Sequence, residues 1–400
     1  MKDKQKPLIR FKGFTEAWEQ RKLGDVGSVS MCRRIFKEQT SEDGDIPFYK
    51  IGTFGAEPDS FISKELFDEY KKKYPYPKKG DILISASGSI GRTVEFTGKN
   101  EYFQDSNIVW LNHNGRIDNT FLKCFYNVVK WSGLEGSTIQ RLYNDNILKT
   151  EISIPSITEQ VAIGKYFEQL DHLITLHQRK YEKLVNVKKS MLEKMFPRDG
   201  ECVPEIRFSG FTEAWEQRKL DDEVEFYNGL TYTPADTVES GGTLVLRSSN
   251  VQNGEIVTDD NVYVKSDVVN SINVQVGDIA VVVRNGSKEL IGKHAIIKEN
   301  MPFTVIGAFM TGIRSEQSAF INALLNTQLF DKEIEKNMGA TINQITAGMF
   351  KSMEFMFPTE SEQKRIGEYF DHLDHLITLH QRELEKLQNI KKSCLEKMFL

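Results

Sequence analysis

The chain has 400 residues, of which 39% are hydrophobic and 27% charged, as in soluble globular proteins that hold two or more domains. The sequence has no apolar run near the roughly 20 residues that cross a bilayer, and MKDKQKPLIRF at the N-terminus lacks the apolar core of a secretory signal, so we expect a cytoplasmic protein. The net charge of -5, with -9 carried by residues 221–361 alone, excludes a strongly basic DNA-binding module.

Two segments of the chain occur twice. IRFKGFTEAWEQRKL at 9–23 returns as IRFSGFTEAWEQRKL at 206–220, with 14 of 15 residues identical. Residues 159–197 match 362–400 at 28 of 39 positions. Two such long units form a duplication and not a solenoid. We therefore divide the chain into an arm, a domain and a helix, twice over: 1–23, 24–158 and 159–197, then 198–220 (linker and second arm), 221–361 and 362–400.

Each of the two domains mixes strand and helix signals. Short β-rich runs such as DILISAS and NIVWL in the first, and TLVLRSS and DIAVVVR in the second, alternate with helical stretches such as 118–132 and 316–336. This pattern predicts two α/β or α+β domains, and the strand order cannot be read from it.

Three polar segments of the first domain have faint counterparts in the second. They are PFYKIGT (47–53) with LVLRSSN (244–250), SASGSIGR (85–92) with VRNGSKELIGK (283–293), and STIQRLYND (137–145) with ATINQITAG (340–348). Their side chains are of the types that read base edges, although each could equally be an ordinary exposed loop residue. The candidates are Lys50, Ser85, Ser87, Arg92, Gln140, Arg141, Arg247, Asn250, Arg284, Asn285, Lys288, Lys293, Asn343 and Gln344.

The two repeated 39-residue segments have the pattern of long helices. A hydroxyl followed three residues later by glutamate, Ser156 with Glu159 and Thr359 with Glu362, predicts a capping box at each start. Apolar residues then recur at spacings of four and three, the seam of a coiled coil. The central seam positions are Leu170, Ile174, His177, Tyr181 and Leu184 in the first helix and Leu373, Ile377, His380, Leu384 and Leu387 in the second.

We expect the two seams to pack on each other in an antiparallel pair, which gives the chain an internal pseudo-two-fold symmetry. In the predicted register Leu170 meets Leu387, Leu184 meets Leu373, and His177 faces His380. Five histidines, at 172, 177, 372, 375 and 380, lie on these helices, so a metal site is an alternative to a polar seam layer. The missing pattern of carboxylate ligands favours the polar layer, and the four scattered cysteines form no C-x-x-C motif that would support a zinc site.

The F-x-G-F-T-x-A-W-E-Q-R-K-L arm and the E-Q-x-x-I-G-x-Y-F-x-x-L-D-x-L-I-T-L-H-Q-R helix start resemble the specificity subunits of type I restriction-modification systems, and the resemblance covers the whole chain. It implies two target-recognition domains that each read one half of a split DNA sequence, with the helices setting the spacer. It also implies that two methylation subunits and restriction subunits bind the chain. Any S-adenosylmethionine, ATP and magnesium would belong to those partner subunits, and this chain would carry no cofactor.

In this family the arms and helices form the docking surface for the methylation subunits. The resemblance therefore makes Phe14, Trp18, Phe211 and Trp215 candidates for partner contact. The alternative is that these aromatic residues only cover the ends of the helix pair, and the two roles are compatible.

Catalytic signatures do not appear in the sequence. A G-x-G-x-x-G motif between a strand and a helix is absent, and GSKELIGKH (286–294) departs from a phosphate-binding loop in its spacing and in its final histidine. We therefore expect a non-catalytic DNA-recognition subunit. The competing interpretation is a coiled-coil adaptor whose two variable domains bind other proteins.

Overall fold

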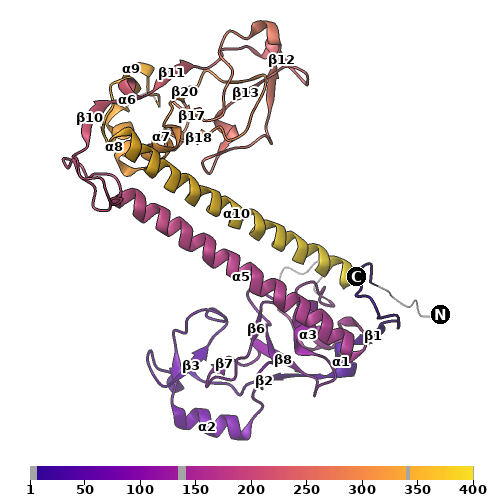
Figure 1. Ribbon diagram of the computed structural model, residues 1–400. Coiled ribbons are helices and arrows are strands. Elements are labelled where there is room, and N and C mark those ends of the chain that lie inside the picture. Colours follow the sequence, from indigo (N-terminus) through magenta and orange to yellow (C-terminus); the bar gives the residue numbers. More distant parts are fainter. Residues whose placement is uncertain (1–6, 134–140, 339–342, 400) are drawn as a thin grey trace. The chain divides into compact units, whose positions relative to one another are not determined.

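A computed structural model describes residues 7–133, 141–338 and 343–399. The chain forms two units: unit 1 comprises Met1–Gln178 and Arg382–Leu400, and unit 2 comprises Arg179–Gln381. Each unit contains the first part of one long helix and the last part of the other, α5 (Ile157–Lys194) and α10 (Glu360–Met398) (Figure 1). Within the described ranges, no helix is both long enough and apolar enough to cross a membrane.

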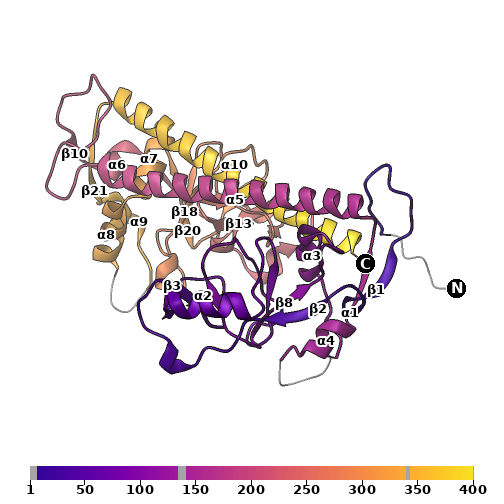
Figure 2. The ribbon, with the colours of Figure 1, turned by 90° about the horizontal axis from the view of Figure 1, so that it is seen from below.

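The first domain, in unit 1, is built on two small sheets. One is antiparallel with strand order β2-β8-β5-β6, and the other has the order β4-β3-β7 with β3 and β7 parallel. The elements before α5 are β1 (Glu19–Lys22), α1 (Leu23–Val26), β2 (Ser28–Met31), β3 (Ile46–Tyr49), β4 (Phe61–Ile62), α2 (Lys64–Lys73), β5 (Ile82–Ser85), β6 (Thr93–Glu95), β7 (Tyr102–Phe103), β8 (Ile108–Asn112), α3 (Asn119–Tyr126), α4 (Asn144–Lys149) and β9 (Glu151–Ile154). The short helices α1 and α4 pack side by side (Figure 2).

Unit 2 repeats this strand order. Its sheets run β11-β20-β17-β18 and β12-β16-β13-β19, again with one parallel pair, β13 and β19. The elements before α10 are β10 (Glu216–Lys219), α6 (Leu220–Glu223), β11 (Glu225–Asn228), β12 (Thr237–Val238), β13 (Thr243–Leu246), β14 (Val251–Gln252), β15 (Glu255–Ile256), β16 (Val262–Val264), β17 (Ile279–Val282), β18 (His294–Ile296), β19 (Thr304–Ile306), β20 (Met310–Arg314), α7 (Ser318–Leu325), α8 (Gln328–Asn337), α9 (Ala347–Lys351) and β21 (Glu354–Phe357). The mixture of antiparallel sheets and helices is α+β, in agreement with the predicted class.

Each repeated arm ends as a strand of its own unit. The EQRK segment of the first arm, β1, pairs antiparallel with β9, and the same four residues of the second arm, β10, pair with β21. The arm is therefore joined by backbone hydrogen bonds to the strand that leads into the long helix. The predicted boundaries at residues 23 and 220 therefore do not separate the arms from the rest of their units.

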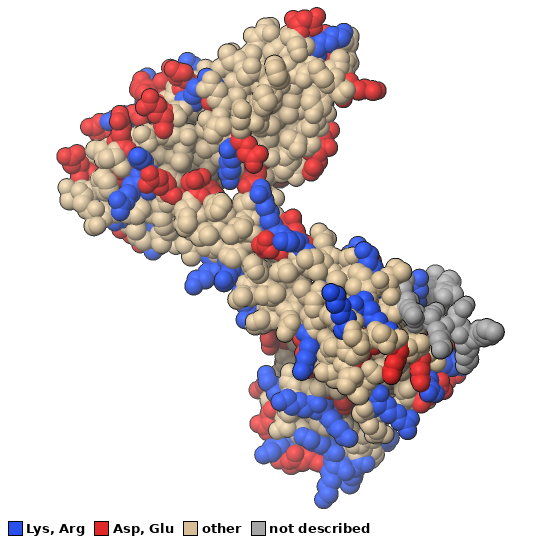
Figure 3. All heavy atoms as spheres, turned by 45° about the vertical axis from the view of Figure 1, so that its right-hand side comes forward, with Lys and Arg blue, Asp and Glu red and all other residues tan. Residues whose placement is uncertain are grey.

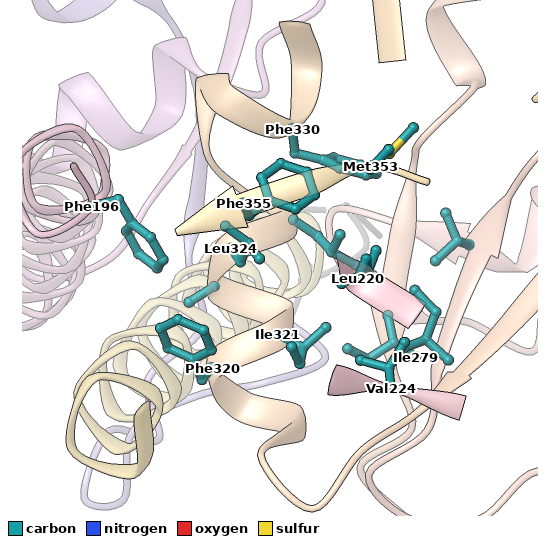
Figure 4. Packing of buried hydrophobic residues seen from close by; sticks show 14 of the residues in the cluster. Phe196, Leu220, Val224, Ile279, Phe320, Ile321, Leu324, Phe330, Met353 and Phe355 are labelled. Carbon is teal, nitrogen blue, oxygen red and sulfur yellow. The ribbon is translucent and has the colours of Figure 1, made fainter. Parts of the chain in front are cut away.

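The core of unit 2 joins the recognition domain to both long helices. Phe196, just after α5, stacks on Phe320 of α7 with ring centroids 5.6 Å apart, and it lies 6.2 Å from Phe370 of α10. Figure 4 shows Phe196, Phe320, Leu324 and Phe355 turned toward one another between these elements. Burial of such large aromatic side chains, about 150–250 Å² each, makes this cluster the main hydrophobic contact between helix and domain.

The long helices run antiparallel in each unit, as predicted. In unit 1 the Tyr166 hydroxyl lies 3.7 Å from Cys394 Sγ, and Asp171 binds Lys391 at 2.6 Å. In unit 2 the equivalent ion pair joins Lys188 to Asp374, also at 2.6 Å. The predicted register would set residue 386 or 387 opposite Asp171. The residue that pairs with Asp171, Lys391, lies about one helical turn farther along α10. Side chains of a helix lean toward its N-terminus, so an ion pair need not join directly opposed residues, and the register stays a prediction.

Four of the ten predicted seam residues belong to the hydrophobic clusters of their units. Leu170 and Leu387 belong to one cluster in unit 1, and Leu184 and Leu373 belong to one cluster in unit 2. Ile174 and Leu384 in unit 1, like Tyr181 and Ile377 in unit 2, are half-buried. His177 and His380 fall in different units, so their predicted pairing remains a prediction.

The first turn of each long helix holds its arm through a buried ion pair, and the predicted capping box at the same glutamate stays a prediction. Arg10 donates to both carboxylate oxygens of Glu159 at 2.6 Å, and Arg207 does the same to Glu362 at 2.7 Å. The glutamate side chains are only 1% and 0% exposed. We call each pair a latch, because it fixes the arm to the start of the helix.

The arm tryptophans are buried, which is contrary to their predicted role in partner contact. Trp18 packs 6.2 Å from Phe399 and Trp215 packs 5.8 Å from Phe196, so each indole covers the last turn of the helix whose start belongs to the other unit. Trp18 is 6% and Trp215 3% exposed. The alternative role, covering the helix ends, fits these contacts. Phe14 and Phe211 are half-buried.

One glycine in each long helix allows close approach to the recognition domain. A Cβ on Gly367 would lie 2.7 Å from the backbone nitrogen of Phe320 in α7. A Cβ on the equivalent Gly164 would collide with the side chain of Thr120 in α3. The repeated I-G-x-Y-F segment therefore sets the distance at which helix and domain pack.

His294, at the start of β18, is half-buried and makes its contacts within the second domain. His294 Nδ1 lies 2.9 Å from the carbonyl oxygen of Gly292, and the Asn326 side-chain amide lies 3.1 Å from Nε2. Because Asn326 also donates to the Asn322 carbonyl oxygen at 2.7 Å, its NH₂ group is oriented to donate toward Nε2 of His294. Burial lowers the pKa of this imidazole, and the nearby Lys188 lowers it further.

Candidate functional site

In unit 1, three loop segments meet at one edge of the recognition domain. The Ala86 N–H, just after β5, donates to the Asn107 carbonyl oxygen at 2.7 Å, and the Leu142 N–H donates to the Ala86 carbonyl oxygen at 2.8 Å. An antiparallel bridge joins Ser87 to Arg141. Backbone bonding therefore brings together two of the polar segments that the sequence predicted, 85–92 and 137–145, beside a third segment that precedes β8.

Unit 2 builds the same edge with the same backbone bonds. The Val283 N–H donates to the Phe309 carbonyl oxygen at 2.9 Å, and the Ile345 N–H donates to the Val283 carbonyl oxygen at 2.9 Å. The bridge here joins Arg284 to Gln344. We call these two places the bridge sites of units 1 and 2.

The bridge site of unit 1 presents an arginine beside an exposed aromatic ring. Arg141 donates to Ser106 Oγ at 3.1 Å, and its guanidinium lies 5.8 Å from the ring centre of Tyr143, which is 61% exposed. Ser87 Oγ lies 2.9 Å from Asn107 Oδ1. The site thus combines a cation, hydroxyls, an amide and an aromatic face.

The bridge site of unit 2 has the same combination from different positions. The Arg284 guanidinium lies 5.1 Å from the ring centre of Phe309, which is 55% exposed. Asn285 donates to Ser248 Oγ at 3.0 Å, and Asn343 donates to the Gly286 carbonyl oxygen at 3.0 Å. In unit 2 the arginine of the bridge, Arg284, comes from the segment after β17, whereas in unit 1 the arginine, Arg141, comes from the segment before α4. The two equivalent bridges therefore carry their arginine on opposite sides.

Several other predicted residues surround the bridge sites in ion pairs or loop contacts. Lys50 binds Asp59 at 2.8 Å and Arg247 binds Asp260 at 2.7 Å, while Arg92 donates to the Gly55 carbonyl oxygen at 3.3 Å. Lys288 and Lys293 continue the loop of Arg284, in a 3-10 turn and just before β18. Gln140 lies outside the described residues.

Two predicted base-reading residues are wrong, because both are buried. Ser85 is 1% exposed, and its hydroxyl accepts from the Arg92 N–H at 3.0 Å and bonds the Ser89 carbonyl. Asn250 is fully buried, accepts from the Arg247 N–H at 2.9 Å and donates to the Val257 carbonyl oxygen at 3.0 Å. Both side chains hold the shape of a loop and cannot reach a ligand.

The sequence reasoning missed the third segment of each bridge site. Ser106 and Asn107 in unit 1 and Phe309 in unit 2 directly precede β8 and β20. In unit 1 the polar run QDSN before the apolar NIVWL was a usable signal. In unit 2 the lone Phe309 within an apolar run resembles a core residue, and only its exposure distinguishes it.

Arginine, asparagine, glutamine and serine on exposed loops are the side chains that bind base edges and phosphates, and exposed aromatic rings can stack on bases. Across the described residues, no group of three or more histidine, cysteine, aspartate or glutamate side chains is arranged to hold a metal ion. The bridge sites therefore offer side chains that can form hydrogen bonds and stack.

Comparison with known proteins decides the family. A family model described as the type I restriction modification DNA specificity domain matches residues 15–186 and again residues 212–389. The chain belongs to this family. The two matches coincide with the two arm, domain and helix repeats, so the duplication in the sequence is a duplication of the family's domain.

Among similar proteins, a putative type I restriction enzyme specificity subunit of Haemophilus influenzae, S.HindORF215P, is 63% identical over 157 residues, which are 38% of this chain and 41% of that relative. The type I restriction enzyme MjaVIII specificity subunit of Methanocaldococcus jannaschii is 24% identical over 79% of this chain and 74% of its own length. The type I restriction-modification S subunit of M. genitalium has the same fold, with a TM-score of 0.59 at 16% identity over 99% of each chain.

Proposed function

We propose that this chain is the DNA-specificity subunit of a type I restriction-modification complex and that it has no catalytic activity of its own. Its two domains each read one half of a split target through the bridge sites. The observation that carries this proposal is the recurrence of one backbone frame with different side chains, Ser87 and Arg141 in unit 1 and Arg284 and Gln344 in unit 2. Two domains with the same backbone arrangement but different side chains at the bridge are suited to bind two different DNA sequences.

We further propose that the two long helices form a coiled coil that fixes the spacer, and that each helix docks one methylation subunit. Equivalent shallow grooves support the docking. One is lined by Arg179, Glu182, Lys183, Asn186, Val187, Ser190 and Met191, and the other by Arg382, Glu385, Lys386, Asn389, Ile390, Ser393 and Cys394. Five of the seven positions are identical between the helices, which suits a partner that binds twice.

The test is selection from random duplex DNA by the full-length chain, co-purified with co-expressed methylation subunits. Enrichment of a bipartite motif with a fixed gap supports the proposal. The absence of enrichment, together with tight binding of the recognition domains to another protein, would favour the adaptor interpretation.

Individual residues of the bridge sites provide the finer test. Replacing Arg284 by alanine is expected to relax the sequence preference in one half of the motif, and replacing Arg141 in the other half. Variants that weaken binding to all sequences equally would assign both arginines to phosphate contacts.

A further inference from the structure

Unit 1 carries a basic surface at the end of α2. Three consecutive lysines, Lys71, Lys72 and Lys73, form the last turn of α2, and Arg33 lies 5.3 Å from the ring centre of Tyr74, the residue that caps this helix. We call these five residues the basic strip. Lys and Arg side chains gather at the lower end of unit 1 in Figure 3, at the height where α2 lies in Figure 1.

The second recognition domain has no equivalent of α2. Residues 63–81, between β4 and β5, contain six lysines and four acidic residues, whereas residues 265–278, between β16 and β17, contain one lysine and two aspartates. A 3-10 turn, Ser266–Val268, takes the place of the helix. Acidic side chains are prominent on the face of unit 2 that Figure 3 shows.

A chain of contacts leads from the bridge site of unit 1 to the basic strip. Arg141 donates to Ser106, and the neighbouring Asp105 accepts from Arg34 at 2.8 Å. Arg33, next to Arg34, then lies over the ring of Tyr74 at the end of α2. These contacts link the strip and the bridge site through residues 33–34 and 105–106 of the same domain.

We infer that the basic strip binds the phosphate backbone of the DNA duplex that flanks the half-site read by unit 1. This inference rests on the proposed DNA-reading function and adds to it that the two domains hold DNA unequally. Unit 1 contributes phosphate contacts of its own, whereas unit 2 depends on its partner subunits for such contacts. A lysine that neutralises a phosphate releases counterions from the DNA, and this release strengthens binding.

A simpler role for the lysines has to be separated from this one. Lysines in the last turn of a helix interact favourably with the helix dipole, and Lys73 also pairs with Glu69 at 2.9 Å. Lys71 lies 4.9 Å from the ring centres of Phe67 and Tyr76, so it packs on the domain core. The test variant therefore changes Lys72 and Lys73 to glutamine and leaves Lys71 in place.

The experiment measures binding of the full-length chain, in complex with the methylation subunits, to a labelled random duplex over a series of salt concentrations. Each lost phosphate contact is expected to reduce the slope of log K against log salt by about 0.9, so the double variant should lose about 1.8. The matched control changes Lys332 and Lys336 to glutamine in α8, a helix of the same ten-residue length in unit 2, and should leave the slope unchanged.

An unchanged slope in the Lys72 and Lys73 variant, with or without a lower melting temperature, would overturn the inference and leave the lysines a stabilising role in α2. An equal fall in the α8 control would also overturn it, because the effect would then follow net charge and not the strip. Failure of the proposed function is a separate result, the absence of an enriched split motif for the wild-type complex, since the slope is measured on random DNA.

Discussion

The latch between Arg207 and Glu362 allows a quantitative test of what holds the arm. Replacing Arg207 by methionine keeps most of the side-chain volume but leaves the Glu362 carboxylate, which is fully buried, without its bidentate partner. Removing one member of a buried ion pair costs about 3–5 kcal/mol. The unpaired Glu362 carboxylate would lie only at the contact between the arm and the helix. We therefore expect the arm to detach locally before the unit unfolds.

Hydrogen exchange measured by mass spectrometry is the appropriate assay, because a protein with two units need not unfold in two states. The reporting amides are Ile206, which donates to the Lys194 carbonyl oxygen at 2.9 Å, and Trp215, which donates to that of Cys202 at 2.8 Å. A cost of about 3 kcal/mol or more corresponds to at least about 100-fold lower protection at these amides.

Arg198 provides the matched control, since it lies in the same connection and pairs with Glu205 at 2.9 Å, but its side chain is 69% exposed. Its replacement by methionine should change protection by less than about fivefold, because exposed pairs contribute at most about 1 kcal/mol. The double change of Arg207 and Glu362 to methionine should recover most of the protection. Equal, small losses in the Arg207 and Arg198 variants would refute the reasoning.

Three further results are expected. Gly367→Ala should destabilise unit 2 by about 1–3 kcal/mol, because the added Cβ meets the Phe320 backbone. The control Gly348→Ala in α9, where the added Cβ meets nothing within 4 Å, should be neutral or stabilising. Equal melting temperatures of the two variants would contradict this prediction. Because the folded-state pKa of His294 is lowered from 6.5, the unfolded state binds more protons below that pH, so stability is full above pH 6.5 and falls toward pH 5. His294→Gln should flatten the pH dependence of the melting temperature. If the variant keeps the same pH dependence, other titrating groups are responsible for it. Arg141→Ala and Arg284→Ala should each weaken binding to the preferred half-site by about 1–3 kcal/mol in direct titrations, whereas equal weakening on all sequences would indicate phosphate contacts.

Repetition made the frame of the molecule predictable. The arms and the long helices could be placed because both copies carry nearly the same residues, and the start of each helix was correct to a few residues. Their detailed contacts could not be predicted from local pattern. Glu159 fits a capping box by spacing, but a charged partner 149 residues away in the chain, Arg10, binds it more strongly than a backbone N–H would.

Burial explains the errors at the candidate site. Ser85 and Asn250 were assigned outward roles from residue type and the two arm tryptophans from the family resemblance, and the fold places all four inside. Conversely, Phe309 has the residue type of a core position but lies exposed at the bridge site. Strand order decides these cases, and the sequence offered no means to derive it.

The two units together indicate how such a protein can change what it reads without changing how it folds. The bridge sites are held by backbone hydrogen bonds, from Ala86 to Asn107 and from Val283 to Phe309, and these bonds do not depend on the side chains that project from them. The arginine can therefore stand on either side of the bridge, as Arg141 and Arg284 do. The latches and the helix glycines, in contrast, depend on particular side chains or on having none, and they are the same in both copies. Among these features, the positions held by backbone bonds differ between the two copies, and identity is retained where a side chain must meet one particular partner.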